Sequence, residues 1–267
     1  MSVRGIDRAA LLGDVVRAAS WLASQLAAAR RDGASCEVHC ATVLGLDVAA
    51  LTLRDPAIAG TAQEAADTFA GALRAGGGQP RDAVAFALVA ALHPGESAFA
   101  PARGALTAAA HGVRPLEAGP DACAQVLGGD DAALAALCDR IELRGVRGNL
   151  AARRELGLAL AARAFSAARA PTRSAFAMHV LRAAAGARLD PATTAEALAF
   201  ARRQQRVDGA YGHLPVSTQT AGDLRAAFHL PWTVAALRLV HDALAPVPLV
   251  RAKTSRQPEG DSPSARK

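Results

Sequence analysis

The chain has 267 residues, of which 51% are hydrophobic, 4% are aromatic and 20% are charged, and its formal net charge is +6. Four cysteines are too few for a disulfide framework, and no basic stripe with interleaved aromatic residues appears, so we expect no disulfide-rich secreted domain and no nucleic-acid partner. Asp7 and Asp14 interrupt any signal-peptide core, and Arg, Asp or Gly breaks every apolar run before it reaches membrane-spanning length. We therefore expect a cytoplasmic protein with reduced thiols and no membrane contact.

Alanine dominates the sequence and predicts an almost wholly helical protein. Alanine has the highest helix propensity, and alternating β-branched runs are nearly absent, so we expect no sheet. One large core suits the length, and nothing requires a second domain. We expect a single helical domain over residues 1–245 and a disordered tail, rich in Pro, Ser and charge, over residues 246–267.

In the first half of the chain, glycines and prolines separate the predicted helices. Apolar residues at helical spacing mark the first helix, which the Asp32-Gly33 turn ends. Gly76-Gly77-Gly78 interrupts the helices further on, and Pro80 suits a helix start. The predicted helices of this half span residues 7–30, 36–53, 62–73, 80–92, 105–110 and 121–127.

In the second half, capping signals locate the helices. Asp130-Asp131 and Asn149 are N-cap candidates, and Asp190-Pro191 combines an N-cap with proline at the first helical position. Short turns usually make successive helices antiparallel, so the series predicts helical hairpins, with an irregular α-solenoid as the alternative. The predicted helices of this half span residues 132–141, 150–169, 173–187, 191–205 and 228–244.

The segment from Ala192 to Leu244 holds the most informative pattern: a Gln at a helix end, a glycine-rich turn with one aromatic residue, a polar loop, and a helix start with Pro and Thr. Gly tolerates positive φ, and Asp accepts from its own downstream backbone, so the turn is expected to brace two helices. The tyrosine is expected to lay its ring on the helix pair with its hydroxyl bonded, and the proline to occupy the first helical turn. The residues of this pattern are Gln205, Asp208, Gly209, Tyr211, Gly212, Pro231 and Thr233.

This pattern resembles the repeat of the α/α-toroid superfamily, which includes the squalene and hopene cyclases and the protein prenyltransferase β-subunits. The resemblance implies an all-α, single-domain α/α toroid, a ring of antiparallel helical hairpins around a central cavity. It also implies that the residues from Asp208 to Gly212 mainly brace helix ends. A weaker echo, Trp21 to Gln25 followed by Asp32-Gly33, is compatible with chain ends that meet in a closed ring.

Two histidines flank the polar loop and are the candidate proton-transfer groups. Imidazole titrates near neutral pH, and His229 precedes a predicted helix start, where backbone amides can hold an anion or an enolate. We predict His229, His213 and Tyr211 as catalytic residues. The alternative is that both histidines are loop residues whose ring nitrogens bond to backbone carbonyls. The predicted substrate contacts are Arg203, Asp223 and Trp232.

No metal or other cofactor is predicted. Cys36, His39 and Cys40 fall on one face of a helix and could begin a zinc site, but the usual paired-cysteine and His-Glu signatures are missing. Buried free thiols in an Ala-rich core are the ordinary alternative. Asp130-Asp131 matches neither acidic motif of the terpene cyclases, so carbocation cyclisation is not expected.

These features favour an enzyme-like toroid of bacterial specialised metabolism, which makes natural products. It would fold a flexible substrate in its cavity, either a modified peptide or a hydrophobic small molecule, for ring closure or another modification by metal-independent acid/base chemistry. For a dehydrated peptide, that chemistry is thiol deprotonation and enolate protonation. The alternative is a noncatalytic toroid that binds a peptide or a partner enzyme as a scaffold.

Overall fold

The computed structural model describes residues 7–104, 114–167, 174–212 and 222–244, and most of these residues are helical. The all-α prediction is therefore confirmed. The elements in chain order are α1 (Arg8–Asp32), α2 (Cys36–Leu53), α3 (Pro56–Arg74), α4 (Ala83–Leu92), the 3-10 turn η1 (Ser97–Phe99), β1 (Leu116–Glu117), α6 (Pro120–Gly128), α7 (Asp131–Arg144), β2 (Val146–Arg147), α8 (Leu150–Ala167), α9 (Ser174–Gly186), α10 (Pro191–Arg203) and α11 (Gly222–Leu244).

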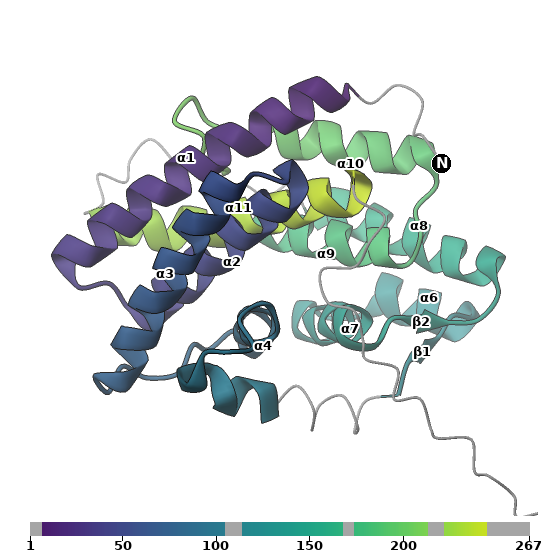
Figure 1. Ribbon diagram of the computed structural model, residues 1–267. Coiled ribbons are helices and arrows are strands. Elements are labelled where there is room, and N and C mark those ends of the chain that lie inside the picture. The colour runs from purple at the N-terminus through teal and green to yellow at the C-terminus, as the bar shows by residue number, and fades with distance from the viewer. Residues whose placement is uncertain (1–6, 105–113, 168–173, 213–221, 245–267) are drawn as a thin grey trace, which may run out of the picture.

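Two buried helices organise the core, and a third joins them (Figure 1). In the N-terminal half, α2 packs against α1, α3 and α4. In the C-terminal half, α9 packs against α7, α8 and α10. Helix α11 contacts both α2 and α9, and it also contacts α1, so the last described helix lies against the first. The two halves consequently share one continuous apolar core.

Helix α2 corrects the expectation that no apolar run reaches membrane-spanning length. Its 18 residues have a mean hydropathy of 1.5, which makes it the one described helix that is long and apolar enough to cross a membrane. However, 67% of this window is buried inside the protein, where α2 contacts four other helices. Packing on all sides accounts for a helix that is apolar all round.

Local capping explains the predicted helix starts that are confirmed. Asp130 accepts a hydrogen bond from the amide of Ala133 at 2.6 Å, and Asn149 accepts one from Ala152 at 2.7 Å. Asp190 accepts from two amides of the first turn of α10, with Pro191 at the first helical position. These side chains satisfy amides that have no partner within the helix.

Several expectations about the elements are wrong. Helix α4 begins at Ala83 rather than at Pro80, because Asp82 caps it. Helix α3 begins at Pro56 rather than at residue 62, because Asp55 caps it. Helix α11 begins at Gly222, so Pro231 lies inside the helix and not in its first turn. Proline removes one helical hydrogen bond, and the buried contacts of α11 with α2 and α9 offset that loss. The sheet expected to be absent exists as one short parallel pair, β1 with β2.

The turn between α10 and α11 docks on α1, and we call this contact the seam. Gln205 donates from Nε2 to the backbone oxygen of Asp14 at 2.8 Å. The buried carboxylate of Asp14 pairs with Arg17 at 2.6 Å and with Arg202 at 2.8 Å. Gly209 has a φ of +98°, and a Cβ there would lie 2.2 Å from the backbone oxygen of Arg17. The turn therefore presses backbone to backbone against the first helix.

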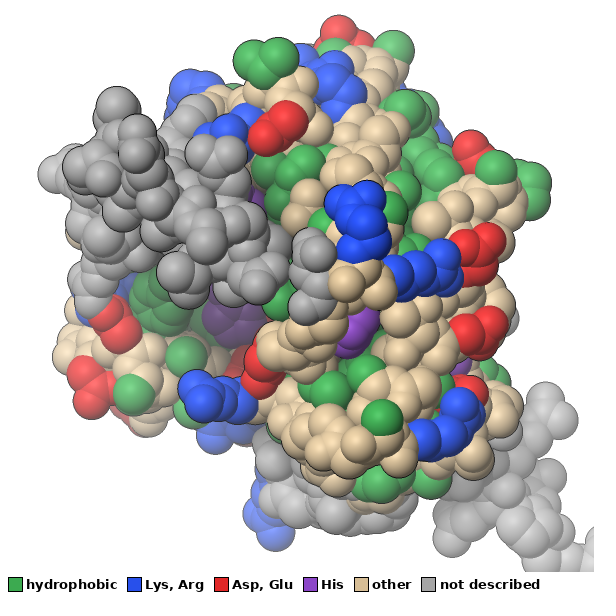
Figure 2. All heavy atoms as spheres, turned by 90° about the vertical axis from the view of Figure 1, so that its left-hand side faces the viewer, with side chains coloured by type: hydrophobic (Ala, Val, Ile, Leu, Met, Phe, Trp, Pro, Cys, Tyr) green, Lys and Arg blue, Asp and Glu red, His purple; other side chains and the backbone are tan. Residues whose placement is uncertain are grey.

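The rest of the turn follows the predicted bracing chemistry. Asp208 accepts from the downstream amide of Ala210 at 3.2 Å. Gly212 has a φ of +92°, and a Cβ there would lie 2.5 Å from the ring of Trp232. Tyr211 is buried as expected, but its hydroxyl has no hydrogen-bond partner among the described residues. On the face of the molecule that Figure 2 shows, arginine and acidic side chains are interspersed.

A side chain at Gly209 should weaken the seam. We expect Gly209→Ala to lower the free energy of unfolding by about 3 kcal/mol, since it adds a backbone clash to the strain of positive φ. Gly76→Ala is the matched control, because Gly76 has a φ of +90° with nothing within 4 Å of the added Cβ, and it should cost only about 1 kcal/mol. Urea unfolding followed by circular dichroism measures both. Equal losses in the two variants would contradict this account of the seam.

Candidate functional site

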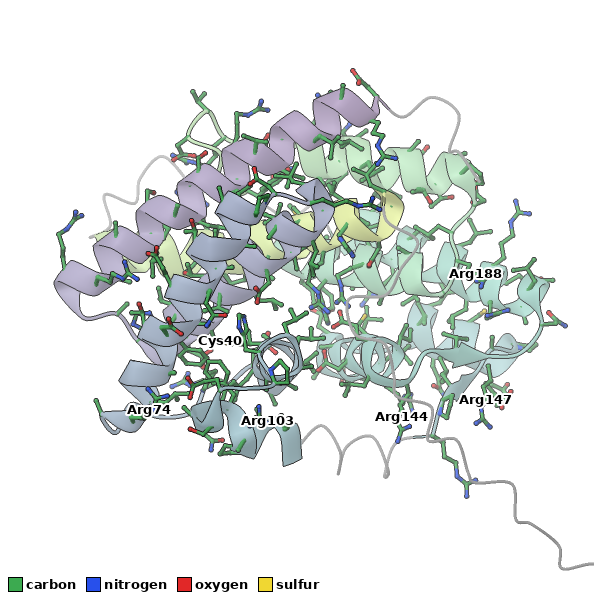
Figure 3. The ribbon with its side chains drawn as sticks, in the orientation of Figure 1. Cys40, Arg74, Arg103, Arg144, Arg147 and Arg188 are labelled. Carbon is green, nitrogen blue, oxygen red and sulfur yellow. The ribbon has the colours of Figure 1, made fainter. Side chains whose placement is uncertain are left out.

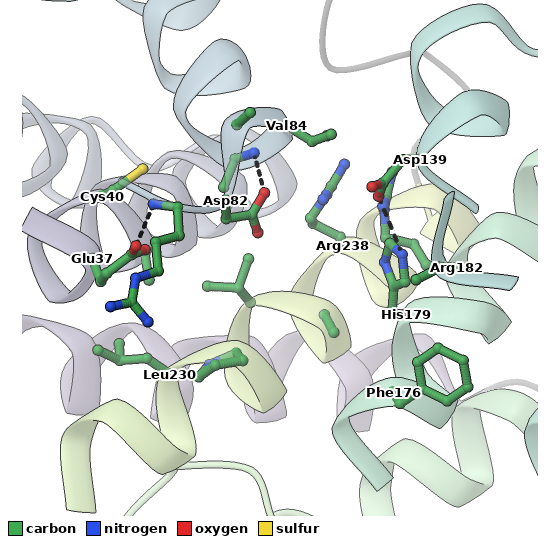
Figure 4. A pocket seen from close by; sticks show the side chains of 18 of the residues that line it. Glu37, Cys40, Asp82, Val84, Asp139, Phe176, His179, Arg182, Leu230 and Arg238 are labelled. Atoms are coloured by element: carbon green, nitrogen blue, oxygen red, sulfur yellow. Dashed lines mark hydrogen bonds and ion pairs between the residues drawn. The ribbon is translucent and has the colours of Figure 1, made fainter. Parts of the chain in front are cut away.

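A cavity of about 720 Å³ lies where α2, α4, α7, α9 and α11 meet (Figure 4). The first turns of α2 and α4 form one side of it, and α7, α9 and α11 form the other. Most of the wall is apolar, so the cavity suits a molecule with a hydrophobic body. The apolar lining residues include Val38, Ala41, Val84, Phe176, Leu230 and Val234.

One end of the cavity is built from a buried charge cluster. Arg182 of α9 and Arg238 of α11 line the cavity, and Glu142 of α7 contacts both guanidinium groups. Arg238 donates from Nη2 to Glu142 at 2.8 Å. Asp242 lies 3.9 Å from Nε of Arg182. The cluster thus ties three helices together through two positive and two negative side chains.

Burial dominates the electrostatics of this cluster. Desolvation lowers the pKa of Arg182 well below its usual range, and it lowers the pKa of Arg238 to about 10. Desolvation also raises the pKa of Asp242, although the two arginines oppose that rise. Such groups remain charged in a dry environment only because their partners are close.

His179 is the titratable ring that lines the cavity beside this cluster. Its Nε2 lies 3.4 Å from a carboxylate oxygen of Asp139, and its Nδ1 lies 3.5 Å from one of Glu142. The side chain of His179 is 27% exposed, so a bound molecule can reach it. Each ring nitrogen therefore faces a carboxylate.

The other end of the cavity carries a second set of polar groups around the first turns of α2 and α4. Glu37 accepts a hydrogen bond from the amide of Arg81, and Asp82 caps α4 by accepting from Ala85 at 2.8 Å. Cys40 lies on the same side of the cavity as these two carboxylates (Figure 4). Burial, and to a smaller extent Asp82 and Glu37, raise the pKa of its thiol well above the ordinary value. Cys40 is therefore a neutral thiol in the wall of the cavity.

The cysteines and histidine of α2 do not assemble a metal site in the described structure. His39 stacks on Phe69 with 6.5 Å between ring centroids, while Cys36 lies beside Gly77 and Cys40 faces the cavity. Among the residues that the structure describes, no three His, Cys, Asp or Glu side chains are grouped closely enough to hold a metal ion.

Helix α4 is held over the cavity by a buried ion pair with α2. Nε2 of His93 lies 2.9 Å from a carboxylate oxygen of Asp47. Arg103 donates to backbone oxygens of the turn that follows α4, and Arg74 pairs with Glu96 in the same turn. Figure 3 shows Arg74 and Arg103 at the same edge of the molecule. These contacts fix the C-terminal end of α4. The first turn of the same helix forms part of the cavity wall.

The structure brings together three of the residues predicted from the sequence, away from this cavity. His229 is buried, and its Nδ1 lies 2.9 Å from the carbonyl oxygen of Tyr211, which can only accept, so Nδ1 carries the proton. Its ring meets Trp21 edge-on, with 6.4 Å between centroids. Trp232 packs on Gly212. The residues His229, Tyr211 and Trp232 are not part of the cavity lining.

The other three predicted residues are scattered or fall outside the description. Arg203 is exposed and lines a shallow depression beside the seam, with Asp14 and Arg17. Asp223 lies in the first turn of α11, and its side chain is outside the described part. His213 is outside the described residues.

The sequence interpretation missed most of the polar groups of the cavity. Asp139 and Glu142 stand three residues apart on α7, and His179 and Arg182 stand three residues apart on α9. Such spacing puts each pair on one face of its helix, which is a detectable signal. The same spacing is equally typical of a solvent-exposed helix face. Spacing alone therefore does not indicate that the polar faces of α7 and α9 meet.

The chain matches no protein family, no curated protein and no solved structure.

The buried pair of Asp47 and His93 should make stability depend on pH. Burial lowers the pKa of His93, but the hydrogen bond and charge of Asp47, with Asp67 and Glu96, outweigh it and raise the pKa overall. Burial raises the pKa of Asp47, with His93 opposing. The folded protein thus holds protons more tightly than the unfolded chain, and the stabilisation by His93 is lost as pH rises through its raised pKa.

We therefore expect the melting temperature to fall between about pH 6 and about pH 8, and His93→Gln to reduce that slope. At about pH 6 the variant should lose about 2 kcal/mol of stability, because Asp47 stays buried without its charged partner. Adding Asp47→Asn to His93→Gln should recover part of the loss. Differential scanning calorimetry across this range measures all three proteins, and an identical slope with and without His93 would refute the assignment.

Proposed function

We propose that this chain binds a flexible, largely apolar molecule in the cavity between α2, α4, α7, α9 and α11, and modifies it by acid/base chemistry at His179. The observation that carries the proposal is the composition of the cavity wall. Apolar side chains cover most of it, and a proton-transfer group backed by buried charges stands at one end. Binding sites of small molecules commonly combine these features.

His179 is the acid/base group in this proposal because it is the imidazole that lines the cavity. General acid/base catalysis needs a group within hydrogen-bonding reach of the substrate, and its proton must have a source or a destination. Asp139 fills that second role at 3.4 Å from Nε2, and Nδ1 exchanges the proton with the substrate, since Glu142, 3.5 Å from Nδ1, is already engaged by the two arginines. His229 is 1% exposed and bonds to a backbone carbonyl, which supports a bracing role for it.

The proposal extends to the architecture and the setting of the protein. The seam between the turn after α10 and the first helix supports a small α/α-toroid ring in which the two ends of the fold meet. Within that ring, the cavity would fold a modified peptide or a hydrophobic small molecule for ring closure, since holding two reactive ends together replaces an encounter in solution. Cytoplasmic, bacterial natural-product metabolism is the setting in which we propose this activity.

The alternative is a noncatalytic protein that holds a peptide or small molecule, or presents it to a partner enzyme. The thiol of Cys40 favours this alternative, because its raised pKa leaves it poorly suited to act as a nucleophile. Binding alone needs the cavity but no proton transfer at His179, so the two functions differ in a measurable way.

A small ketone tests binding and acid/base chemistry together. We expect 2-octanone to bind, as seen by saturation-transfer NMR, and its α-protons to exchange with deuterium oxide faster in the presence of the protein. His179→Gln should bind the ketone but lower the exchange rate about a hundredfold, the usual contribution of one acid/base group. Ala41→Phe should weaken binding by occupying part of the cavity beside the apolar wall, whereas Ala151→Phe, on the exposed face of α8, should leave it unchanged.

The outcomes separate the two functions. Binding without accelerated exchange would support the scaffold and exclude the enzyme. Binding that Ala41→Phe leaves unchanged, or no binding by the wild-type protein, would remove the cavity from either role.

A further inference from the structure

Arg182 and Arg238 offer more hydrogen-bond donors than their surroundings use. Each guanidinium has five N–H groups. Glu142 accepts a hydrogen bond from Arg238 and contacts Arg182, and the Nε atoms of both arginines are shielded from solvent and have no hydrogen-bond partner among the described residues. Both side chains line the cavity, and the two residues are only 8% and 7% exposed. Glu142 and Asp242 engage only part of the two guanidinium groups, so the N–H groups that border the cavity favour an oxygen atom there.

The net charge of the cluster decides whether a charged or a neutral ligand oxygen can bind there. The positive charges of Arg182 and Arg238 are already balanced by Glu142 and Asp242. Asp139 adds a further carboxylate beside His179. A ligand carboxylate or phosphate would bring excess negative charge into this dry region, and an uncompensated buried charge is strongly unfavourable. A neutral acceptor satisfies the free N–H groups without that cost.

The charges on either side of Arg238 also limit a cationic ligand. In Figure 4, Arg238 lies between Asp82 on one side and Asp139 on the other. The acidic groups there are engaged, since Asp82 caps α4 and Asp139 faces His179. An ammonium group would therefore have to approach two buried guanidinium groups to reach them.

We propose that the ligand presents a neutral carbonyl oxygen, as in an amide, ketone or ester, to Arg182 and Arg238. This inference rests on the proposed function. Its apolar body lies along the wall formed by Val38, Leu230 and Val234. This arrangement brings the carbonyl group beside His179, where a proton can move to or from the adjacent carbon. Peptide-like and polyketide-like chains belong to this class, and fatty acids in their ionised form do not.

Three probes with the same chain and different head groups test the proposal: octanamide, octanoate and octylamine. At about pH 7.5 we expect octanamide to bind about tenfold more tightly than either charged probe, as measured by isothermal titration calorimetry on the full chain. Equal or tighter binding of octanoate would overturn the neutral-carbonyl assignment and indicate an anion site. Tightest binding of octylamine would overturn it in favour of the carboxylates.

Arg238→Lys provides the second readout, because lysine keeps the positive charge facing Glu142 but lacks the planar set of donors. The ratio of the octanamide and octanoate dissociation constants should fall about tenfold in this variant, and in Arg182→Lys, relative to the wild type. A ratio measured on one protein does not depend on the fraction that is folded. An unchanged ratio in both variants would refute the role of the arginines.

Failure of the proposed function gives a different result. If none of the three probes binds the wild type, or if Ala41→Phe leaves their binding unchanged, the cavity is not the binding site and both proposals fall. If the probes bind in the cavity without preference for octanamide, only the carbonyl assignment falls.

Discussion

The contact of Glu142 with two buried arginines is the interaction on which the polar end of the cavity depends. Arg182 comes from α9 and Arg238 from α11, and neither charge could be buried without a carboxylate at close range. Glu142 comes from a third helix, α7, so a single side chain fixes how three helices approach one another. The same residue faces His179, which couples the helix packing to the proposed proton transfer. Replacing such a cluster with apolar residues would often be neutral for stability, so a binding role gives a reason for the charges.

The rest of the fold positions the opposite wall of the cavity. Helix α11 packs on α2 and α9 and carries both the apolar surface and Arg238, so it supplies residues to both ends. The seam at Gly209 holds the turn before α11 on α1, and the pair of Asp47 and His93 holds α4 on α2. These anchors lie outside the cavity, which leaves its wall free for contacts with a ligand.

Features that depend on neighbouring residues were predictable from the sequence, and features that depend on distant ones were not. The caps at Asp130, Asn149 and Asp190 and the turn at Asp208-Gly209 were predicted because each bonds to backbone only a few residues away. The start of α11 was wrong because burial against two helices outweighs the local signal of Pro231. The cavity draws on five helices, and nothing in the sequence indicates that the polar faces of α7, α9 and α11 meet. For the same reason, the histidine chosen from its loop position, His229, lies in the core, and His179 was overlooked.

A crystal structure of the protein soaked with octanamide tests the central claim most directly. The account predicts density for the amide in the cavity between α2, α4, α7, α9 and α11, with its oxygen within hydrogen-bonding distance of Arg182 or Arg238. Density beside Tyr211, His229 and Trp232, or an amide oxygen directed toward Glu37 and Asp82, would contradict it.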